Sequence, residues 1–350
     1  MMASTRRPRE GRRDKRAAVR PTQKDIAAAA GVSQAAVSMV LNKTETPSVP
    51  AATRARILKL AGELGYQPNH LARMLRSART MALACVIPDI TNPFYPGLVR
   101  GLQSVAATAG YDVLIFDTDG RAEGEERAAS WLLQGRADGV VGTFFHLRAP
   151  QLATLAQKGI PIVRLESQHK PKGPLPIDSV YIDNAEASAA MTRYLIERGH
   201  QRITMILAEV GPSPRRAFGY ASVMRAAGLV PKFVTDGRYS EQSGARAMGE
   251  ILSETRNRAT AIFCANDMLA VGAMVAARAA GLSVPDDIAI VGFDDIPAAK
   301  LLGLTTVRQP EFDLGALAAH TLIRRLQPGG LESPGQSLEL KFEILKRSSA

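Results

Sequence analysis

Residues 22–42, which read TQKDIAAAAGVSQAAVSMVLN, most constrain what this chain can fold into. Apolar residues recur there at the i, i+3, i+4 spacing of a helix face, at Ile26, Ala29, Ala30, Val32, Val37, Val40 and Leu41. Thr22 and Asp25 are spaced as an N-terminal capping pair, and Gly31 suits the left-handed residue that ends a helix. Ser33 can cap a second helix over residues 34–41. The pattern predicts a helix-turn-helix, whose second helix enters the DNA major groove; a helical hairpin that only packs is the alternative.

The charge of the chain is concentrated on the same segment. The 350 residues carry a net charge of +11. Residues 1–80 hold 16 basic residues (Lys and Arg) against 5 acidic residues (Asp and Glu), whereas residues 81–350 hold 28 basic and 28 acidic residues. A basic segment on a neutral body is the electrostatic pattern of a nucleic-acid-binding module, because a surplus that served solubility would be spread over the whole surface.

Two features indicate a cytoplasmic protein without a membrane partner. No apolar stretch approaches the length of a transmembrane helix, and no apolar region of a signal peptide follows the basic N-terminus. Cys85 and Cys264 lie in the apolar runs ALACVIP and AIFCAND, so they are predicted to be buried small hydrophobes and not a disulfide.

The first 80 residues divide into three predicted parts. Residues 1–20 are basic and poor in apolar side chains, which predicts a disordered tail that either follows DNA phosphates or is simply solvated. Residues 21–68 are predicted to be the helix-turn-helix headpiece, completed by a third helix over about 51–64 that Gly65 closes. Residues 69–79 are too short for a stable isolated helix, and are either a hinge helix that folds on DNA or a linker.

From residue 80 the pattern changes to alternating strands and helices. Strands are predicted at 81–88, 112–117, 139–143, 161–164, 179–182, 202–207, 232–235, 261–264 and 288–292. Amphipathic helices are predicted at 95–110, 123–134, 150–158, 185–198, 215–227, 240–253, 266–280 and 312–325. Such alternation predicts an α/β fold with parallel sheets covered on both faces. About 265 residues suit two lobes with a ligand cleft between them, at the C-terminal ends of the strands.

The order of several motifs resembles the LacI/GalR family of bacterial transcription regulators. These motifs are AAGVSQAAVSMVLN, LGYQPNHLARMLRS, IPDITNPFY, ADGVV, YLIERGHQRI, TAIFCANDMLAVG, VPDDIAIVGFDD, LTTVRQP and EILKRSS. The resemblance implies an all-α headpiece, a hinge helix and a two-lobed core like a periplasmic binding protein, at 80–347. It places lobe one at about 80–180 and 311–330, and lobe two at about 181–310 and 331–347. It also implies a homodimer, and a tetramer is less favoured because no heptad-bearing tail follows the last strand motif.

By this resemblance, the chain has a predicted DNA interface in the headpiece and the hinge. Its members are Thr22, Ser33, Gln34, Ala35, Ser38, Met39, Asn42, Thr53, Asn69, Arg73 and Leu75. Gln34 and Ala35 match base-reading positions, which suit an adenine edge and a thymine methyl. Met39 stands where many relatives have an arginine, so the commonest guanine reader is missing.

The remaining members of this interface are expected to position the protein and bend the DNA. Ser33, Ser38, Asn42 and Thr53 match positions that contact phosphates without reading sequence. Leu75 matches a leucine that wedges into the minor groove and kinks the duplex, although an ordinary core leucine is the alternative.

The resemblance also implies an effector pocket between the lobes. Its predicted members are Phe94, Tyr95, Phe145, Arg216, Tyr239, Asn266, Asp294 and Gln309. An arginine, an aspartate and aromatic walls suit a sugar or sugar derivative, with a purine or nucleoside as the alternative. Arg216 and Asp294 have a second interpretation as a purely structural ion pair across the cleft.

Signatures of catalysis and cofactor binding are missing from the sequence. There is no G-x-G-x-x-G after the first strand, no P-loop and no G-x-S-x-G elbow. The five histidines have no metal-ligand spacing. We therefore predict a ligand-responsive transcriptional repressor that binds double-stranded DNA at a pseudo-palindromic operator, with no cofactor and no catalytic residues. The alternatives are a solute-binding protein without a regulatory role and an enzyme on the same fold.

Overall fold

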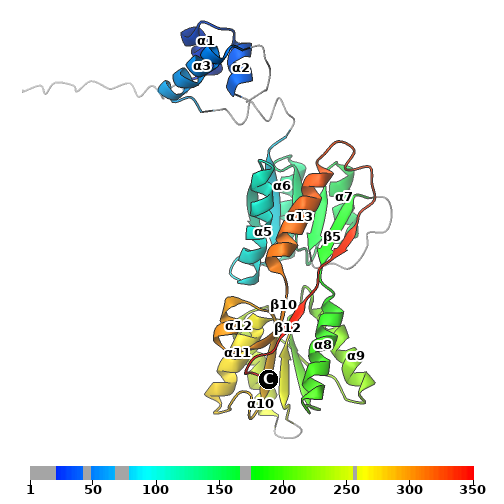
Figure 1. The fold of residues 1–350 in the computed structure, drawn as a ribbon. Helices are drawn as coiled ribbons and strands as arrows, with labels where there is room; N and C mark the ends of the chain where they lie inside the picture. Colours follow the sequence, from blue (N-terminus) through cyan, green and yellow to red (C-terminus); the bar gives the residue numbers. More distant parts are fainter. Residues whose placement is uncertain (1–20, 42–48, 68–78, 166–174, 255–257) are drawn as a thin grey trace, which may run out of the picture. The chain divides into compact units, whose positions relative to one another are not determined.

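The structure, a computed structural model, describes residues 21–41, 49–67, 79–165, 175–254 and 258–350 (Figure 1). The chain forms two compact units, which meet in sequence between Ala78 and Arg79. The predicted disordered tail and nearly all of the predicted hinge helix lie outside the described residues.

The headpiece contains three helices: α1 (Gln23–Ala30), α2 (Gln34–Leu41) and α3 (Ala51–Glu63). The Asp25 carboxylate accepts hydrogen bonds from the backbone N–H and the hydroxyl of Thr22, at 2.7 and 2.8 Å. Gly31 has φ +63°, and the Ala36 N–H donates to the Ser33 hydroxyl, so the predicted turn between the two helices is present. The three helices enclose a small apolar core, whose buried members include Ile26, Val37, Val40, Ile57 and Ala61.

The second unit contains two six-stranded sheets. The first sheet has the order β11-β5-β4-β3-β1-β2 and the second has the order β12-β10-β9-β8-β6-β7. Strands of the first sheet are β1 (Ala82–Ile87), β2 (Asp112–Asp117), β3 (Gly139–Gly142), β4 (Ile162–Leu165), β5 (Ile177–Tyr181) and β11 (Ser337–Glu339). Strands of the second sheet are β6 (Ile203–Leu207), β7 (Lys232–Thr235), β8 (Ala261–Cys264), β9 (Ala289–Asp294), β10 (Thr305–Arg308) and β12 (Glu343–Leu345). Among the described residues, every strand pair is parallel except β10 with β12.

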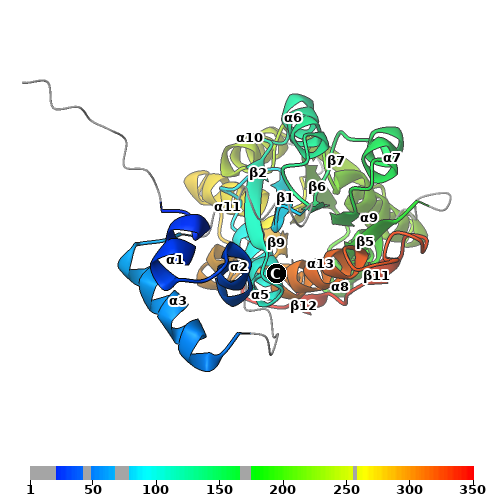
Figure 2. The same cartoon turned by 90° about the horizontal axis from the view of Figure 1, so that it is seen from above.

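Helices cover both faces of each sheet (Figures 1 and 2). The helices of lobe one are α5 (Phe94–Thr108), α6 (Ala122–Leu133), α7 (Ala149–Gln157) and α13 (Glu311–Arg325). The helices of lobe two are α8 (Asn184–Glu197), α9 (Ser213–Ala226), α10 (Glu241–Ser253), α11 (Asp267–Ala279) and α12 (Pro297–Leu301). Strand β1 shows why two helical layers are needed. Its residues are all buried, with Leu83, Cys85 and Ile87 in the core on the α5 and α13 side and Ala84 and Val86 in the core on the α6 and α7 side.

Close helix contacts depend on glycines that face a neighbouring backbone. A Cβ at Gly101 of α5 would lie 1.9 Å from the Phe312 carbonyl oxygen, and a Cβ at Gly315 of α13 would lie 1.9 Å from the Leu98 carbonyl oxygen. Helices α5 and α13 therefore pack backbone to backbone along their N-terminal halves. Figure 2 shows the two helices side by side.

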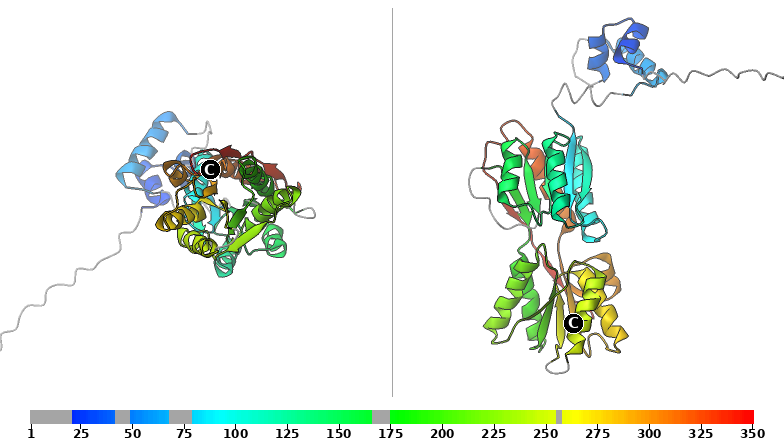
Figure 3. Two further views of the ribbon diagram at one scale, coloured as in Figure 1. Left: turned by 90° about the horizontal axis from the view of Figure 1, so that it is seen from below. Right: turned by 180° about the vertical axis from the view of Figure 1, so that it is seen from behind.

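The chain passes between the two lobes three times (Figures 1 and 3). The connections run from β5 to α8, from β10 to α13 and from β11 to β12. Three connections that lie near one another allow the lobes to rotate about a hinge, since no other covalent link joins them.

The α/β architecture follows the prediction, with two kinds of correction. The strand β11 pairs with β5 in the first sheet, so the predicted assignment of residues 331–347 to lobe two is wrong for this strand. Strands β10, β11 and β12 and helix α12 are additional to the elements predicted from the sequence.

Candidate functional site

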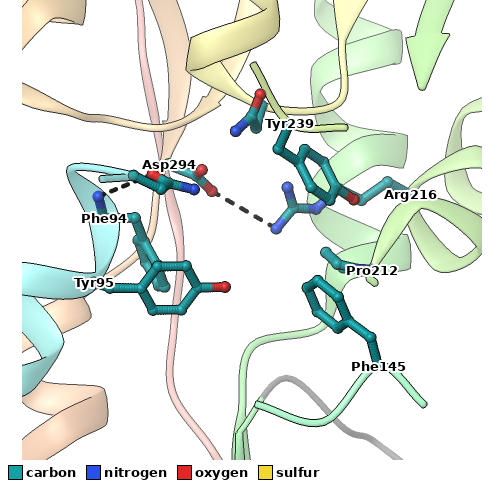
Figure 4. Close-up of a pocket in the computed structure, with 9 residues that line it drawn as sticks. Phe94, Tyr95, Phe145, Pro212, Arg216, Tyr239 and Asp294 are labelled. Atoms are coloured by element: carbon teal, nitrogen blue, oxygen red, sulfur yellow. Dashed lines mark hydrogen bonds and ion pairs between the residues drawn. The ribbon is translucent and has the colours of Figure 1, made fainter. Parts of the chain in front are cut away.

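A cavity of about 240 Å³ lies between the two lobes of the core. It is lined by Asn92, Phe94, Tyr95, Phe145, Pro212, Arg216, Tyr239, Asn266 and Asp294. The first four come from lobe one and the rest from lobe two. In Figure 4, Phe94 and Tyr95 face Arg216 and Tyr239 across the space, and Asp294 extends toward Arg216.

Arg216 of α9 is held in place by lobe two alone. Its side chain is only 2% exposed and lies flat on the Phe293 ring, with Cζ 3.6 Å from the ring centroid. Its Nε donates to the Asn184 side-chain oxygen at 2.8 Å, and its Nη1 donates to the Ala265 carbonyl oxygen at 2.5 Å. These contacts fix the guanidinium plane, so that Nη2 faces Asp294 at 3.7 Å, beyond direct hydrogen-bond distance.

Asp294 sits at the end of β9 in a strained backbone. Its φ is +117° and that of Asp295 is +61°, a region that residues other than glycine rarely adopt. The Asp295 carboxylate accepts from Arg308 Nε at 2.9 Å and from Arg347 Nη2 at 2.5 Å, which anchors the turn. Burial raises the pKa of Asp294 to about 6, against the opposing effects of Arg216 and Gln309.

A second buried carboxyl group lies beneath this turn. Asp267, at the start of α11, is fully buried, and its oxygens contact the Thr306 hydroxyl at 2.6 Å and the Ile296 N–H at 2.9 Å. Burial, and then the nearby Asp294 carboxylate, raise the pKa of Asp267 well above its usual range. Asp294 at the pocket and Asp267 behind it are therefore both costly to ionise.

The wall on lobe one is mostly apolar. Phe94 and Tyr95 open α5, and their rings pack edge to face with centroids 5.2 Å apart. The Asn92 side-chain oxygen accepts from the Phe94 N–H at 3.1 Å, which holds the first turn of this helix. Phe145 follows β3 and completes the wall (Figure 4).

Two buried polar atoms, one at the pocket and one behind it, lack a hydrogen-bond partner in the described part of the chain. They are the amide nitrogen of Asn266, which lines the pocket, and the side-chain oxygen of Gln309, which does not. Asn266 otherwise caps α11, since its oxygen accepts from the Leu269 N–H at 2.9 Å. Gln309 donates to the Asp294 carboxylate at 2.7 Å. Leaving a buried polar atom unpaired is costly, so the free amide donor of Asn266 at the pocket is suited to a polar ligand that carries an acceptor.

The predicted pocket residues lie together with one exception. Seven of the eight line the cavity, whereas Gln309 lies behind Asp294 and does not line it. Asn92 and Pro212 also line the cavity and were not predicted. Asn92 lies in the motif IPDITNPFY, two residues before an aromatic pair. An asparagine at this spacing often accepts a hydrogen bond from a backbone N–H at the start of a helix, and this spacing is the sequence signal for Asn92.

The predicted DNA-binding residues that are described gather around α2. Gln34 and Ala35 are exposed in its first turn, next to the exposed Ser33. Ser38, Met39 and, in the first turn of α3, Thr53 are half-buried. Met39 packs against the headpiece core. Thr22 precedes α1, and Asn42, Asn69, Arg73 and Leu75 lie outside the described residues.

Sequence and structure comparisons agree with this arrangement. The family model described as "Bacterial regulatory proteins, lacI family" matches residues 22–69, and the model described as "Periplasmic binding proteins and sugar binding domain of LacI family" matches residues 80–331. The regulator DegA of Bacillus subtilis is 35% identical, covering 93% of this chain and 96% of DegA. The ribose operon repressor of Escherichia coli is 35% identical, covering 94% and 99%. A lac repressor dimer bound to operator and an anti-inducer has a TM-score of 0.82 at 25% identity, covering 94% and 99%.

The chain belongs to the LacI family of bacterial regulatory proteins. It is a DNA-binding transcriptional regulator with a ligand-binding core, and its relatives are regulators and not enzymes. Within the described ranges, no helix has the length and apolar character needed to cross a bilayer, and no group of acidic, histidine or cysteine side chains is arranged to hold a metal ion.

Proposed function

We propose that this protein is a cytoplasmic homodimeric repressor of a pseudo-palindromic operator, and that a small carbohydrate bound between the core lobes controls its operator affinity. The observation that carries the effector part is the presence of an unpaired Asn266 amide donor beside Arg216 and Asp294, opposite an aromatic wall. A sugar hydroxyl both donates and accepts, so it can bridge the 3.7 Å between Arg216 Nη2 and the Asp294 carboxylate.

The charge and the lining of the cavity favour a neutral sugar. Arg216 and Asp294 carry opposite charges, so the polar wall has no strong preference for an ionic ligand. Phe94 and Tyr95 offer aromatic edges and faces to the apolar side of a sugar ring.

On the DNA side, we propose that residues at the start of α2 contact the base edges and so recognise the operator sequence. The exposed Gln34 suits an adenine edge and Ala35 a thymine methyl, while Ser33, Ser38 and Thr53 hold the phosphates. Two headpieces of a homodimer then read two half-sites, and a hinge leucine, Leu75, kinks the centre. An effector that changes lobe closure alters this binding, with a coupling of about 1–3 kcal/mol, or about 5- to 150-fold in operator affinity.

The test is selection of source-genome fragments bound by the purified full-length protein at one stated salt concentration. We expect enrichment of one pseudo-palindrome, because base contacts add to the salt-sensitive attraction of a basic headpiece. Gln34→Ala should relax the sequence preference, whereas Gln67→Ala, which changes an exposed glutamine after α3, should not. Salt-sensitive binding without an enriched site would contradict specific repression.

The enriched DNA site is then used to identify the class of effector. Monosaccharides, disaccharides and nucleosides are added in turn to the complex, and operator release or tightening is measured. We expect a monosaccharide or a disaccharide to act and Asp294→Asn to remove its effect, while Asp236→Asn, in an ion pair at the surface of lobe two, retains it. A response to nucleosides alone would overturn the carbohydrate assignment.

A further inference from the structure

The two lobes touch at an edge that lies opposite the three connections. The connections leave β5, β10 and β11, which lie at or next to one end of each sheet, whereas β2 and β7 are the strands at the other end. The loops that follow β2 and β7 face each other across the cleft, as the contact between Asp119 and Arg238 shows. In a body that opens about a hinge, contacts at the far edge separate the most, so they distinguish the closed state from the open state.

An ion pair spans this edge. Arg238 Nη1 of lobe two donates to the Asp119 Oδ1 of lobe one at 2.6 Å. Arg121, on lobe one, binds the other oxygen at 2.9 Å, so the carboxylate is held in a fixed orientation. The hydrogen bond from Arg238 is the main cause that keeps the pKa of Asp119 below its usual range, so the pair stays charged at neutral pH.

An aromatic contact lies beside the ion pair. A Cβ added to Gly211 of lobe two would lie 2.7 Å from the Phe145 Cζ of lobe one, which means that the ring rests on the glycine backbone. Gly211 also has φ +72°, so a side chain at this position is disfavoured for two independent reasons. The ring therefore reaches lobe two at a place where only glycine leaves room for it.

Phe145 is positioned by a buried carboxylate that the pocket does not contain. Glu125 of α6 is 1% exposed, and its two oxygens accept the backbone N–H groups of Phe145, His146 and Leu147 at 2.6 to 3.1 Å. The His146 ring then contacts the Gly120 carbonyl oxygen at 2.9 Å. The loop with Phe145 and the loop with Asp119 are thereby joined into one rigid edge of lobe one.

We propose that Asp119–Arg238 and Phe145–Gly211 form a clasp that holds the lobes closed around the effector, and that Glu125 is its positioning residue. The clasp is continuous with the pocket, because Arg238 precedes Tyr239, Gly211 precedes Pro212, and Phe145 is itself in the wall. Its role in effector retention rests on the function proposed above, whereas its role in lobe closure does not.

The test measures the distance between the lobes in the full-length protein. Spin labels are attached to cysteines at Gln134 and Ser253, which are exposed positions on lobe one and lobe two. The native Cys85 and Cys264 are buried with raised thiol pKa values, so they label poorly. Labelled subunits are diluted with an excess of unlabelled ones, so that each distance reports on one chain.

We expect the wild-type protein to show one dominant short distance and Asp119→Asn/Arg238→Gln to populate a longer one. Asparagine tolerates the left-handed backbone of Asp119, so the variant removes charge without adding strain. For an exposed pair, the ratio of open to closed protein should rise about 1.5- to 5-fold. About 1 M salt should shift the wild-type distribution the same way and leave that of the double variant in place, because the Debye length falls to about 3 Å.

The matched control is Glu186→Gln, which breaks the ion pair with Arg193 within lobe two. The side chains of this pair are 56% and 46% exposed, close to the 58% and 55% of Asp119 and Arg238. A distance distribution of Asp119→Asn/Arg238→Gln identical to that of wild type and of this control would overturn the clasp.

Glu125→Gln, whose amide nitrogen cannot accept the loop N–H groups, should also open the lobes. An unchanged distance in this variant would overturn the positioning role of Glu125. None of these distance measurements requires an effector or an operator. A result that contradicts the clasp therefore leaves the proposed repressor function untouched, and the reverse also holds.

Discussion

The two walls of the pocket are built in different ways. On lobe two, Arg216 is fixed by side-chain contacts to Asn184 and Phe293 of the same lobe, and Asp294 is fixed by Gln309, which follows β10 at the start of a connection between the lobes. On lobe one, the aromatic side chains are presented by backbone that is itself held from behind, by Asn92 at the start of α5 and by Glu125 at the loop after β3.

This difference separates the lobe that determines ligand specificity from the lobe whose residues move toward the ligand when the lobes close. The polar wall is assembled within one rigid lobe, so its hydrogen-bond geometry does not depend on lobe closure. The aromatic wall belongs to the other lobe, so it approaches the polar groups only when the lobes close. A ligand that satisfies the polar wall and stacks on the aromatic wall therefore binds the closed arrangement better, which is the differential affinity that a ligand-controlled switch requires.

The largest effect is expected from breaking the polar wall at Arg216. Arg216→Leu leaves the Asn184 oxygen and the Ala265 carbonyl without their buried donor, and it removes the positive charge that lies 3.7 Å from the Asp294 carboxylate. Removing one partner of a buried pair costs about 3–5 kcal/mol of unfolding free energy, and effector binding should be lost with it. Urea unfolding at neutral pH measures the first and operator release the second.

The control is Arg246→Leu, which removes an arginine whose side chain is 62% exposed from an ion pair on lobe two and should change stability by less than about 1 kcal/mol. Adding Asp294→Asn to Arg216→Leu should restore part of the loss, because the unpaired charge is then gone. Equal stability losses for Arg216→Leu and Arg246→Leu would mean that the buried pair does not hold the polar wall.

The next effect concerns the charge of Asp294 and depends on pH. Because the pKa is about 6 in the folded protein and 3.8 in the unfolded chain, the folded state binds more protons between these values. This contribution to stability is fully present below about pH 4 and is lost as the pH rises through about 6. Asp294→Asn should therefore gain stability relative to wild type between about pH 4 and pH 7, by about 3 kcal/mol.

The measurement is the difference in urea midpoint between Asp294→Asn and wild type at several pH values. The absolute offset includes the lost ion pair with Arg216, so only the change with pH is diagnostic. Asp236→Asn provides the contrast, since its bond with Arg246 lowers the pKa of Asp236 and the pH trend should have the opposite sign. A flat difference for Asp294→Asn would mean that the carboxylate is ionised at no cost.

Much of the fold was predictable because its determinants are local. Ser33, Ser240 and Asn266 each cap a helix through a side-chain oxygen, as residue type and position indicate. The membership of β11 in the first sheet was not predictable, because three residues carry no period and their pairing with β5 is set by contacts about 160 residues apart in the chain.

The site was predictable to the level of residue type but not of geometry. The family resemblance identifies Arg216 and Asp294 by position, yet the sequence does not show that Asp294 has a positive φ or that Gln309 stands behind it. Likewise, the glutamate at position 125 looks like any polar residue of an amphipathic helix. Its role appears only when β3 brings three backbone N–H groups to it.

The smallest expected effect compares one asparagine from each wall. Asn92 and Asn266 both use their side-chain oxygens to hold the start of a helix, and both line the pocket. Serine keeps an acceptor at such a position, so Asn92→Ser and Asn266→Ser should each change unfolding free energy by less than about 1 kcal/mol. Asn266→Ser removes a fully buried amide donor that has no partner in the described part of the protein, so it should weaken effector binding more than Asn92→Ser does, by about 5- to 10-fold, as expected for one hydrogen bond of about 1 kcal/mol. Titration of the effector against both variants measures this difference. If the two variants lost affinity equally, the polar contacts would be shared by both walls, and the separation of a rigid polar wall from a moving aromatic wall would not hold.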